Sequence, residues 1–253
     1  MKKELQIFLT AIMFYTRIPV PRWVNHDAQY LNKATKYFPL IGWIAGTLAA
    51  LVFMGANYLF SPSVAIILSM VVSVLLTGAF HEDGFADVCD GFGGGWTKEK
   101  ILLIMKDSRV GAYGVIGLIF MLSTKFYLLS SFAGTKLPFV LLAAHAISRW
   151  AAASFILTHQ YVRENEDSKA KPVAKQFLVS HFLIASLFGI LPLLLFKNVY
   201  VFLLIIPVYT MKIYLGWYFK KWIGGYTGDC LGATQQLCEI IFYLSLLALW
   251  KFI

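Results

Sequence analysis

Residues 177–196 read FLVSHFLIASLFGILPLLLF, and after Lys197 and Asn198 residues 199–219 read VYVFLLIIPVYTMKIYLGWYF. Each run matches the roughly 20 apolar residues that an α-helix needs to cross a bilayer. Lys212 is the only lysine, arginine or acid in either run. Because two residues allow only a tight reversal, the runs are expected to be antiparallel neighbours. The pair predicts an all-α protein made of membrane-spanning helices.

The rest of the chain repeats this pattern. Of its 253 residues, 59% are hydrophobic and 14% are charged, and the mean hydropathy is +0.70. Soluble domains carry about 25% charge, so the chain lacks the polar residues to cover a soluble fold. We predict a polytopic transmembrane helical bundle of about seven spans, forming a single integral-membrane catalytic domain over residues 1–253. The five further runs lie at about 40–60, 62–80, 110–132, 138–158 and 231–253.

The first residues differ from these runs. Residues 5–16 are too short for a confident span and predict an interfacial or re-entrant helix. No cleavable signal peptide is expected, because polar residues interrupt this stretch and no small-residue cleavage site follows. The three cysteines have no CxxC spacing and are expected to be free thiols.

Positive charge is distributed unevenly among the connections. The net charge is +9, and 16 of the 22 lysines and arginines fall before the first predicted span or in the connections after every second span. The opposite side holds only Lys136, Lys197 and Lys251. Cytoplasmic loops carry such an excess, so we predict that the polar connections face the cytoplasm, and we expect no nucleic-acid partner. These connections are 17–39, 81–109, 159–176 and 220–230.

Residues 78–96, GAFHEDGFADVCDGFGGGW, concentrate the acids of the chain. Asp83, Asp87 and Asp90 are spaced i, i+4 and i+7, which places them on one face of a helix. Carboxylates this close repel one another unless a cation lies among them. Oxygen ligands suit Mg²⁺ or Mn²⁺, and Glu82 is a further candidate ligand. A solvated acidic loop is the alternative interpretation.

Two neighbouring features indicate phosphate binding. Gly93, Gly94 and Gly95 can turn backbone N–H groups toward an anion. Arg109 can hold a phosphate through two N–H groups, with Lys106 beside it, although an ordinary basic flank residue is the alternative interpretation.

Charged residues also lie inside the predicted spans. Asp229 stands where the last span begins, as a candidate site residue or a helix N-cap. Glu239 falls ten residues later, roughly 15 Å deeper along a helix. An acid at that depth is costly and is expected to be functional or paired. Its candidate basic partners are Lys125, His145, Arg149 and Lys212.

Several patches together resemble one family, the adenosylcobinamide-GDP ribazoletransferases, also called cobalamin synthases. The similarity extends over nearly the whole chain. Its patches are Thr16-Arg17-Ile18-Pro19, Phe38-Pro39-Leu40-Ile41-Gly42, His81-x-Asp83-Gly84-x-Ala86-Asp87-x-x-Asp90-Gly91, Met105-Lys106-Asp107-Ser108-Arg109-x-Gly111 and Thr227-Gly228-Asp229-x-Leu231-Gly232-Ala233.

The resemblance implies a membrane enzyme of the inner (cytoplasmic) membrane that uses Mg²⁺. The 3′-hydroxyl of α-ribazole, or of α-ribazole 5′-phosphate, would attack the diphosphate of adenosylcobinamide-GDP, and GMP would leave. Asp83, Asp87 and Asp90 would hold metal, and an acid or His81 would accept the hydroxyl proton. Glu82, where relatives have leucine, departs from the family pattern and stays a candidate ligand from the acid spacing alone. Arg109, Lys106, Arg17 and Arg149 would bind substrate, and Asp229 would complete the site.

Other functions remain open at this point. A CDP-alcohol phosphotransferase also places an Asp-Gly motif at a span end, but its motif continues with Ala-Arg, whereas Ala86 is followed by Asp87. A DDxxD-type prenyltransferase fits less well because glycine follows Asp83. A transporter would favour acids near the midplane. The oligomeric state is open, and a homo-oligomer is compatible with the sequence.

Overall fold

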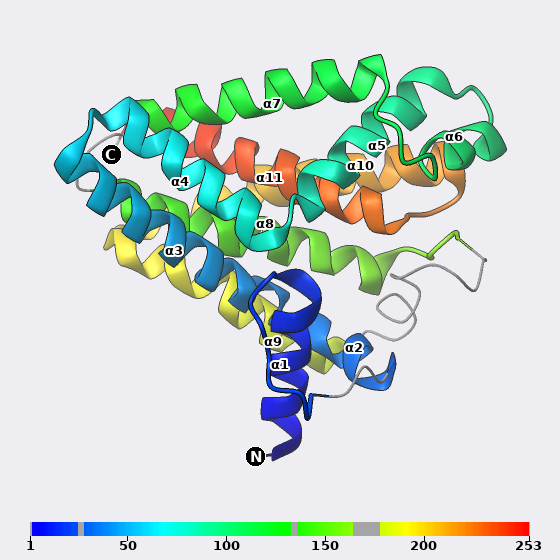
Figure 1. Cartoon of the computed structure of the whole chain (residues 1–253), viewed down its shortest axis with the longest axis horizontal. Helices are drawn as coiled ribbons and strands as arrows, with labels where there is room; N and C mark the ends of the chain where they lie inside the picture. The colour runs from blue at the N-terminus through cyan, green and yellow to red at the C-terminus, as the bar shows by residue number, and fades with distance from the viewer. Residues whose placement is uncertain (1, 25–27, 133–135, 164–177, 253) are drawn as a thin grey trace.

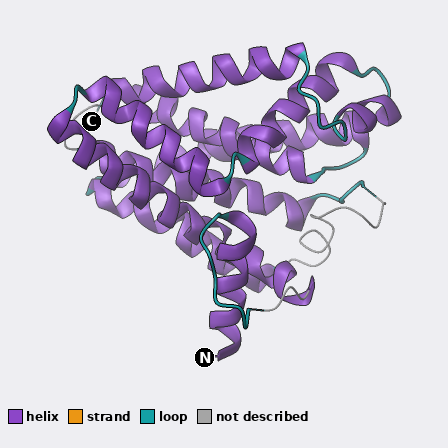
Figure 2. Cartoon of the chain, in the orientation of Figure 1, coloured by secondary structure: helices purple, strands orange, loops and turns teal. Residues whose placement is uncertain are grey.

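The computed structural model describes residues 2–24, 28–132, 136–163 and 178–252. Within these ranges every named element is a helix, and strand-like pairing is limited to one isolated bridge between Tyr161 and Tyr226 (Figure 2). The all-α prediction is confirmed. Three cations counted for the third polar connection, Lys169, Lys171 and Lys175, lie outside the described residues.

Most of the elements are long apolar helices, whereas α2, α6 and the 3-10 helices are short. In chain order they are α1 (Lys2–Tyr15), α2 (Ala28–Ala34), η1 (Thr35–Tyr37), α3 (Phe38–Leu59), α4 (Pro62–Thr77), α5 (Phe80–Gly94), α6 (Lys98–Ile104), α7 (Ala112–Ser131), α8 (Leu137–Thr158), α9 (Val179–Ile190), η2 (Leu191–Phe196), η3 (Val199–Leu204), α10 (Ile205–Ile223) and α11 (Gly228–Leu249).

Six helical stretches in the described part of the chain are long and apolar enough to cross a membrane, and a seventh span is obtained if α4 and α5 count together. The prediction of about seven spans agrees with this count, so the chain is a multi-pass membrane protein. Helix α1 forms where a separate short helix was expected at residues 5–16. The six stretches are Gln29–Leu59, Ala112–Ser131, Leu137–Thr158, Val179–Phe196, Val199–Ile223 and Gly228–Leu249.

The predicted span at 62–80 is wrong at its C-terminal end. Helix α4 stops at Thr77, and α5 leaves at an angle of 87°. Gly78 ends α4 with φ +64°, in the left-handed region that glycine adopts without steric cost, and Ala79 follows at φ +59°. The Ala79 N–H donates to the Val74 carbonyl at 2.9 Å, which satisfies the end of the helix. We call residues 78–79 the elbow.

Helix α8 forms the centre of the bundle. It packs on α3, α9, α10 and α11, and most of its side chains are buried. Its many alanines let helices approach closely, as is usual between spanning helices. On the α3 side, a Cβ added at Gly46 would lie 2.7 Å from the Leu142 Cα, so only glycine allows this crossing.

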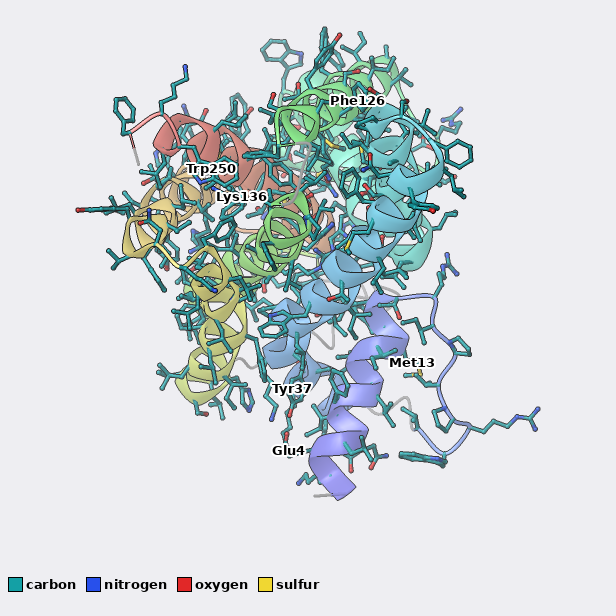
Figure 3. All side chains as sticks on the ribbon, turned by 90° about the vertical axis from the view of Figure 1, so that its left-hand side faces the viewer. Glu4, Met13, Tyr37, Phe126, Lys136 and Trp250 are labelled. Carbon is teal, nitrogen blue, oxygen red and sulfur yellow. The ribbon has the colours of Figure 1, made fainter. Side chains whose placement is uncertain are left out.

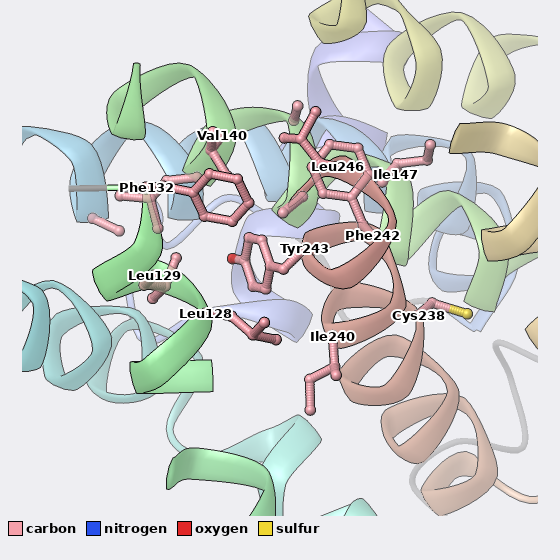
Figure 4. Packing of buried hydrophobic residues seen from close by; sticks show 14 of the residues in the cluster. Leu128, Leu129, Phe132, Val140, Ile147, Cys238, Ile240, Phe242, Tyr243 and Leu246 are labelled. Carbon is pink, nitrogen blue, oxygen red and sulfur yellow. The ribbon is translucent and has the colours of Figure 1, made fainter. Parts of the chain in front are cut away.

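The larger apolar core fills the space between α7, α8 and α11. Tyr243, Phe132 and Leu246 pack against one another there (Figure 4). At this end of the bundle the Lys136 Nζ lies 5.0 Å from the centre of the Trp250 ring, and both residues face the viewer in Figure 3.

The two ends of the bundle differ in chemistry. The short connections α3–α4 and η2–η3 and the C-terminus lie at one end, on the left in Figure 1. The acid-rich helix α5, the α10–α11 turn and the end of α8 lie toward the other. Of the polar connections predicted to share a side, the described parts of 81–109, 159–176 and 220–230 therefore lie toward the same end.

Candidate active site

Helices α5 and α11 meet through glycines at the polar end. A Cβ added at Gly84 would lie 2.9 Å from the Asp229 Cα, and one at Gly232 would lie 3.1 Å from the His81 carbonyl oxygen. The two helices can therefore approach only because neither residue has a side chain. This packing brings the first two turns of α5 alongside the first turn of α11.

The contact creates a group of carboxylates that we call the acid cluster, comprising Asp83, Asp87 and Asp229. Asp87 lies within electrostatic reach of both other acids. Asp83 is exposed, whereas Asp87 and Asp229 are partly buried. Asp83 and Asp87, four residues apart on α5, share a face as predicted, and the packing adds Asp229 from a distant part of the chain.

Arg163 supplies positive charge to this cluster. Its Nη2 donates to Asp229 Oδ2 at 2.7 Å and to the Met105 carbonyl at 3.0 Å. The Val162 N–H donates to the Tyr226 carbonyl at 3.0 Å, which ties this segment to the turn before α11. This role could not be predicted from the sequence, because Arg163 resembles any basic residue on a cytoplasmic flank.

Asp90 has a different environment from the other acids of α5. Its carboxylate accepts the backbone N–H groups of Gly111 and Gly114 at 2.7 and 2.8 Å. It therefore caps the N-terminus of α7, where exposed amides and the helix dipole favour an anion. Asp90 also lies among the electrostatic neighbours of Asp87, so the predicted convergence of Asp83, Asp87 and Asp90 on one ion stays a prediction. The i, i+7 spacing shares a face, but at Asp90 that face meets α7.

The glycine run also serves packing. Gly93 and Gly94 are helical residues of α5, and the Gly95 N–H donates to the Gly91 carbonyl at 2.9 Å. A Cβ at Gly93 would lie 2.6 Å from the Tyr113 ring. The predicted anion-binding turn is therefore not present here, because these glycines continue the helix and make room for α6 and α7.

The predicted phosphate-binding residues lie on the exposed connection between α6 and α7. Arg109 pairs with Asp107, its Nη2 lying 2.7 Å from Asp107 Oδ2, and its side chain is 87% exposed. Hydrogen bonds from Arg109 lower the pKa of Asp107 to about 2. Lys106 is also exposed. Arg109 and Lys106 are thus available at the polar end but do not contact the acid cluster.

Arg17, predicted to bind substrate, lies at the elbow. Its backbone N–H donates to the Leu76 carbonyl at 2.7 Å, and its guanidinium packs on Gly78. This places one exposed cation just before the first turn of α5. The contact connects the segment after α1 with the start of the acid-rich helix.

Four other predicted residues point into the bundle. Glu82 accepts a hydrogen bond from Gln236 Nε2 at 2.9 Å, and Arg149 contacts His145 Nδ1 at 3.1 Å. Glu239 pairs with Lys125, with 3.1 Å between Oε1 and Nζ, which confirms a basic partner for this deep acid. The environment of Glu82 and Arg149 is interior, so neither lies on the open side of the acid cluster. His81 is also buried.

The acid cluster fits a divalent ion that is completed by substrate. Within the described ranges no three acids, histidines or cysteines lie close enough to enclose an ion by themselves. Mg²⁺ is commonly bound through one or two carboxylates together with substrate phosphates and water. Asp83 and Asp87, on one face of α5, can provide these one or two carboxylates. Arg163 is the cation among the described electrostatic neighbours of Asp87.

The chain is similar to known proteins over nearly its whole length. Residues 7–247 match the family model described as Cobalamin-5-phosphate synthase. The chain is 47% identical to the adenosylcobinamide-GDP ribazoletransferase of Shewanella piezotolerans over 249 residues, 97% of this chain and 96% of that protein. It is 47% identical to the one from Shewanella frigidimarina, with 97% and 95% covered. No solved structure matches the chain.

Proposed function

The chain belongs to the cobalamin-5-phosphate synthase family, and from this premise we propose that it is an adenosylcobinamide-GDP ribazoletransferase. It joins α-ribazole, or α-ribazole 5′-phosphate, to adenosylcobinamide-GDP. The 3′-oxygen forms a bond to the corrinoid-linked phosphorus, the bond from that phosphorus to GMP breaks, and the hydroxyl proton passes to a base. The products are the corrinoid nucleotide, as adenosylcobalamin or its 5′-phosphate, and GMP.

One observation carries this proposal: carboxylates from distant parts of the sequence meet at the polar end of the bundle. Asp83 and Asp87 of α5 face Asp229 of α11, which Arg163 holds at 2.7 Å. Phosphoryl transfer needs alignment and charge compensation more than covalent catalysis. The acid cluster, together with the long basic side chains of Arg109 and Lys106 at the same end of the bundle, supplies both the alignment and the charge compensation.

We assign Asp83 and Asp87 to hold a magnesium ion together with the substrate diphosphate. When bound, the ion would offset phosphate charge and stabilise the leaving group. Arg109 and Lys106, on their exposed connection, would bind the outer phosphate oxygens, and Arg17 would approach from the elbow. Arg109 would exchange its exposed partner Asp107 for phosphate, an exchange that costs little at a surface ion pair.

The proton acceptor that we propose is Asp229. Arg163 and Thr227 both donate to its Oδ2, at 2.7 and 3.3 Å. Oδ1 is then the oxygen that can take the proton from the attacking 3′-hydroxyl. Arg163 orients the carboxylate for the arriving hydroxyl.

We further propose that the protein lies in the cytoplasmic membrane with the acid cluster facing the cytoplasm. The excess of lysine and arginine at the polar connections supports this orientation. Single cysteines at Ser61 and Ser108, introduced into a cysteine-free background, test it with an impermeant maleimide. Ser108→Cys should label only in inside-out vesicles and Ser61→Cys only in right-side-out ones, and the reverse pattern would contradict the orientation.

The activity is tested in purified protein with α-ribazole, adenosylcobinamide-GDP and Mg²⁺. Asp83→Asn and Asp87→Asn should each lower turnover at least about 100-fold, the order found when one preorganised charge is removed. Chelation with EDTA should abolish GMP release, and added Mg²⁺ should restore it. Glu99→Gln, which changes an exposed acid of α6 at the same end, is the matched control. Near-normal turnover in both site variants would reject their role.

A further inference from the structure

A pocket adjoins the acid cluster on the side of α1 and α3. Its walls are mostly apolar and include a set of aromatic rings from four separate regions of the chain. The empty space is about 480 Å³, a volume that includes solvent at its open side. The rings belong to Phe14, Tyr15, Phe38, Phe80, His81 and Tyr161.

The His81 imidazole lies among these rings with one nitrogen unpaired. It stacks on Phe38, with 5.7 Å between ring centres and 12° between planes, and meets Phe80 edge-on at 5.6 Å. The residue is 1% exposed, and its buried Nε2 has no hydrogen-bond partner. A buried polar atom without a partner costs about 1–3 kcal/mol. His81 lines the pocket, so a ligand bound there would offer a partner for this nitrogen.

The pocket and the acid cluster share two helices. Gly228, Leu231 and Gly232 of α11 line the pocket, and Asp229 belongs to the same turn. Phe80 and His81 of α5 line it, and Asp83 follows two residues later. A nucleoside with its base in the pocket would therefore carry its ribose toward the carboxylates.

We infer that this pocket binds the aromatic base of the ribazole substrate, with His81 Nε2 hydrogen-bonded to the ring nitrogen that does not carry the ribose. This inference rests on the proposed function. A dimethylbenzimidazole is flat, apolar at its edges and has one free acceptor nitrogen, which matches aromatic walls with one unpaired imidazole nitrogen.

The competing base, guanine, fits this pocket poorly. Guanine presents several donors and acceptors that need partners when buried. Among the polar groups of the wall, Tyr15 and Thr35 already lie within hydrogen-bond distance of each other, with 3.4 Å between their hydroxyl oxygens. The pocket therefore favours the base of ribazole over the base of the leaving nucleotide.

Inhibition by free heterocycles tests the hydrogen bond. Benzimidazole has the acceptor nitrogen and indole lacks it, while the two have nearly the same shape. In the wild-type enzyme benzimidazole should compete with α-ribazole, and not with adenosylcobinamide-GDP, at least about tenfold more strongly than indole. His81→Phe, which keeps the stacking, should reduce this preference to within about twofold. An unchanged preference in His81→Phe would overturn the assignment of Nε2.

Substitutions of pocket-lining residues test which ligand binds in the pocket. Ala153 lines the pocket and is buried, so Ala153→Leu should raise the KM for α-ribazole at least about tenfold and leave the KM for adenosylcobinamide-GDP within about twofold. Ala248→Leu adds the same atoms on an exposed position near the other end of α11 and is the control. Phe80→Leu removes one aromatic wall at similar volume and should raise the α-ribazole KM several-fold, which covers a folding failure of Ala153→Leu.

The other outcomes reject the inference in distinguishable ways. A higher KM for adenosylcobinamide-GDP alone would place guanine or the corrinoid in the pocket. Unchanged KM values in both folded variants would show a pocket filled by an apolar group such as a lipid chain. Wild-type protein that releases no GMP would instead reject the proposed function, before any variant is compared.

Discussion

Asp83 and Asp90 are both aspartates of α5, but they have different roles. Asp83 is exposed beside other acids, whereas Asp90 is 8% exposed and accepts two backbone N–H groups of the α7 N-terminus. The carboxylates around Asp83 repel one another unless a cation is bound, and this arrangement suits a catalytic site. The arrangement around Asp90 satisfies amides that would otherwise be unpaired and suits stability.

Asp90→Ala should therefore lower thermal stability more than activity per folded molecule. Loss of a helix cap costs about 1–2 kcal/mol, and here two amides lose their acceptor. Asp83→Asn should show the opposite behaviour, with an unchanged or higher Tm because like-charge repulsion falls. Thermal unfolding in detergent and GMP release, measured on the same samples, compare the two variants. A larger drop in Tm for Asp83→Asn would contradict this division.

Arg163 is expected to act through Asp229. Arg163→Lys keeps the charge but cannot reach both the carboxylate and the Met105 carbonyl with the geometry of the guanidinium. We expect turnover to fall about tenfold in Arg163→Lys and about 100-fold in Arg163→Gln. The KM for α-ribazole should change little, because the base pocket is intact. Equal activity in wild-type and Arg163→Gln proteins would remove Arg163 from the site.

At the level of elements, the elbow decides where α5 points. Gly78→Ala places a side chain at φ +64° and against the Arg17 guanidinium. The backbone term alone costs about 1–2 kcal/mol, and α5 would shift with its acids. We expect a lower Tm together with reduced turnover.

Gly55 provides the matched control for this change. It lies in the interior of α3, where an added Cβ meets nothing within 4 Å. Gly55→Ala should raise the free energy of unfolding by about 0.5–1 kcal/mol through helix propensity. Denaturant or thermal unfolding of both variants separates general helix effects from the elbow. A stabilising Gly78→Ala would show that the bend is not needed.

The elbow is a part of the fold that the sequence does not predict, whereas most of the spans are predicted. Long apolar runs predicted six of the spans well, because spanning length and apolar composition are enough for that purpose. The bend was missed because Gly78 and Ala79 are small and apolar and pass as residues of a span. Backbone conformation, not hydropathy, ends α4 there.

The site was predictable in part for a similar reason. Helical spacing placed Asp83 and Asp87 on one face, and the patch around Asp229 was recognised as part of the site. The spacing could not show that α7 packs over Asp90 or that Arg163 reaches Asp229, because both depend on how distant helices are rotated against each other. The glycine run was assigned to anion binding, since a packing glycine and a loop glycine look the same in sequence.

At the scale of the whole molecule, a buried polar network connects α5, α7, α8 and α11. Glu239 is 1% exposed and accepts from Lys125, Gln235 and Tyr243, and Gln236 continues the chain to Glu82. Removing one partner leaves a buried charge without compensation. The network therefore couples the packing of the bundle to the helix that carries the acids.

Glu239→Gln should destabilise the protein by about 3 kcal/mol, the magnitude for breaking a buried pair. Combining it with Lys125→Met should recover much of this loss, because neither charge then remains. The free energies of unfolding of both single variants and the double variant form a cycle that isolates the pair. Additive losses in the double variant would show that Lys125 and Glu239 do not depend on each other.

The position of Glu239 near the end of the chain has a consequence for biogenesis. A ribosome delivers α7 and α8, with Lys125 and Arg149, well before it delivers α11. During that interval Lys125 lacks the Glu239 carboxylate with which it pairs, and a lone charge in lipid is costly. The newly made helices must stay near water, a headgroup or the insertion machinery until the last segment arrives. The buried network is therefore completed only after α11 has been made.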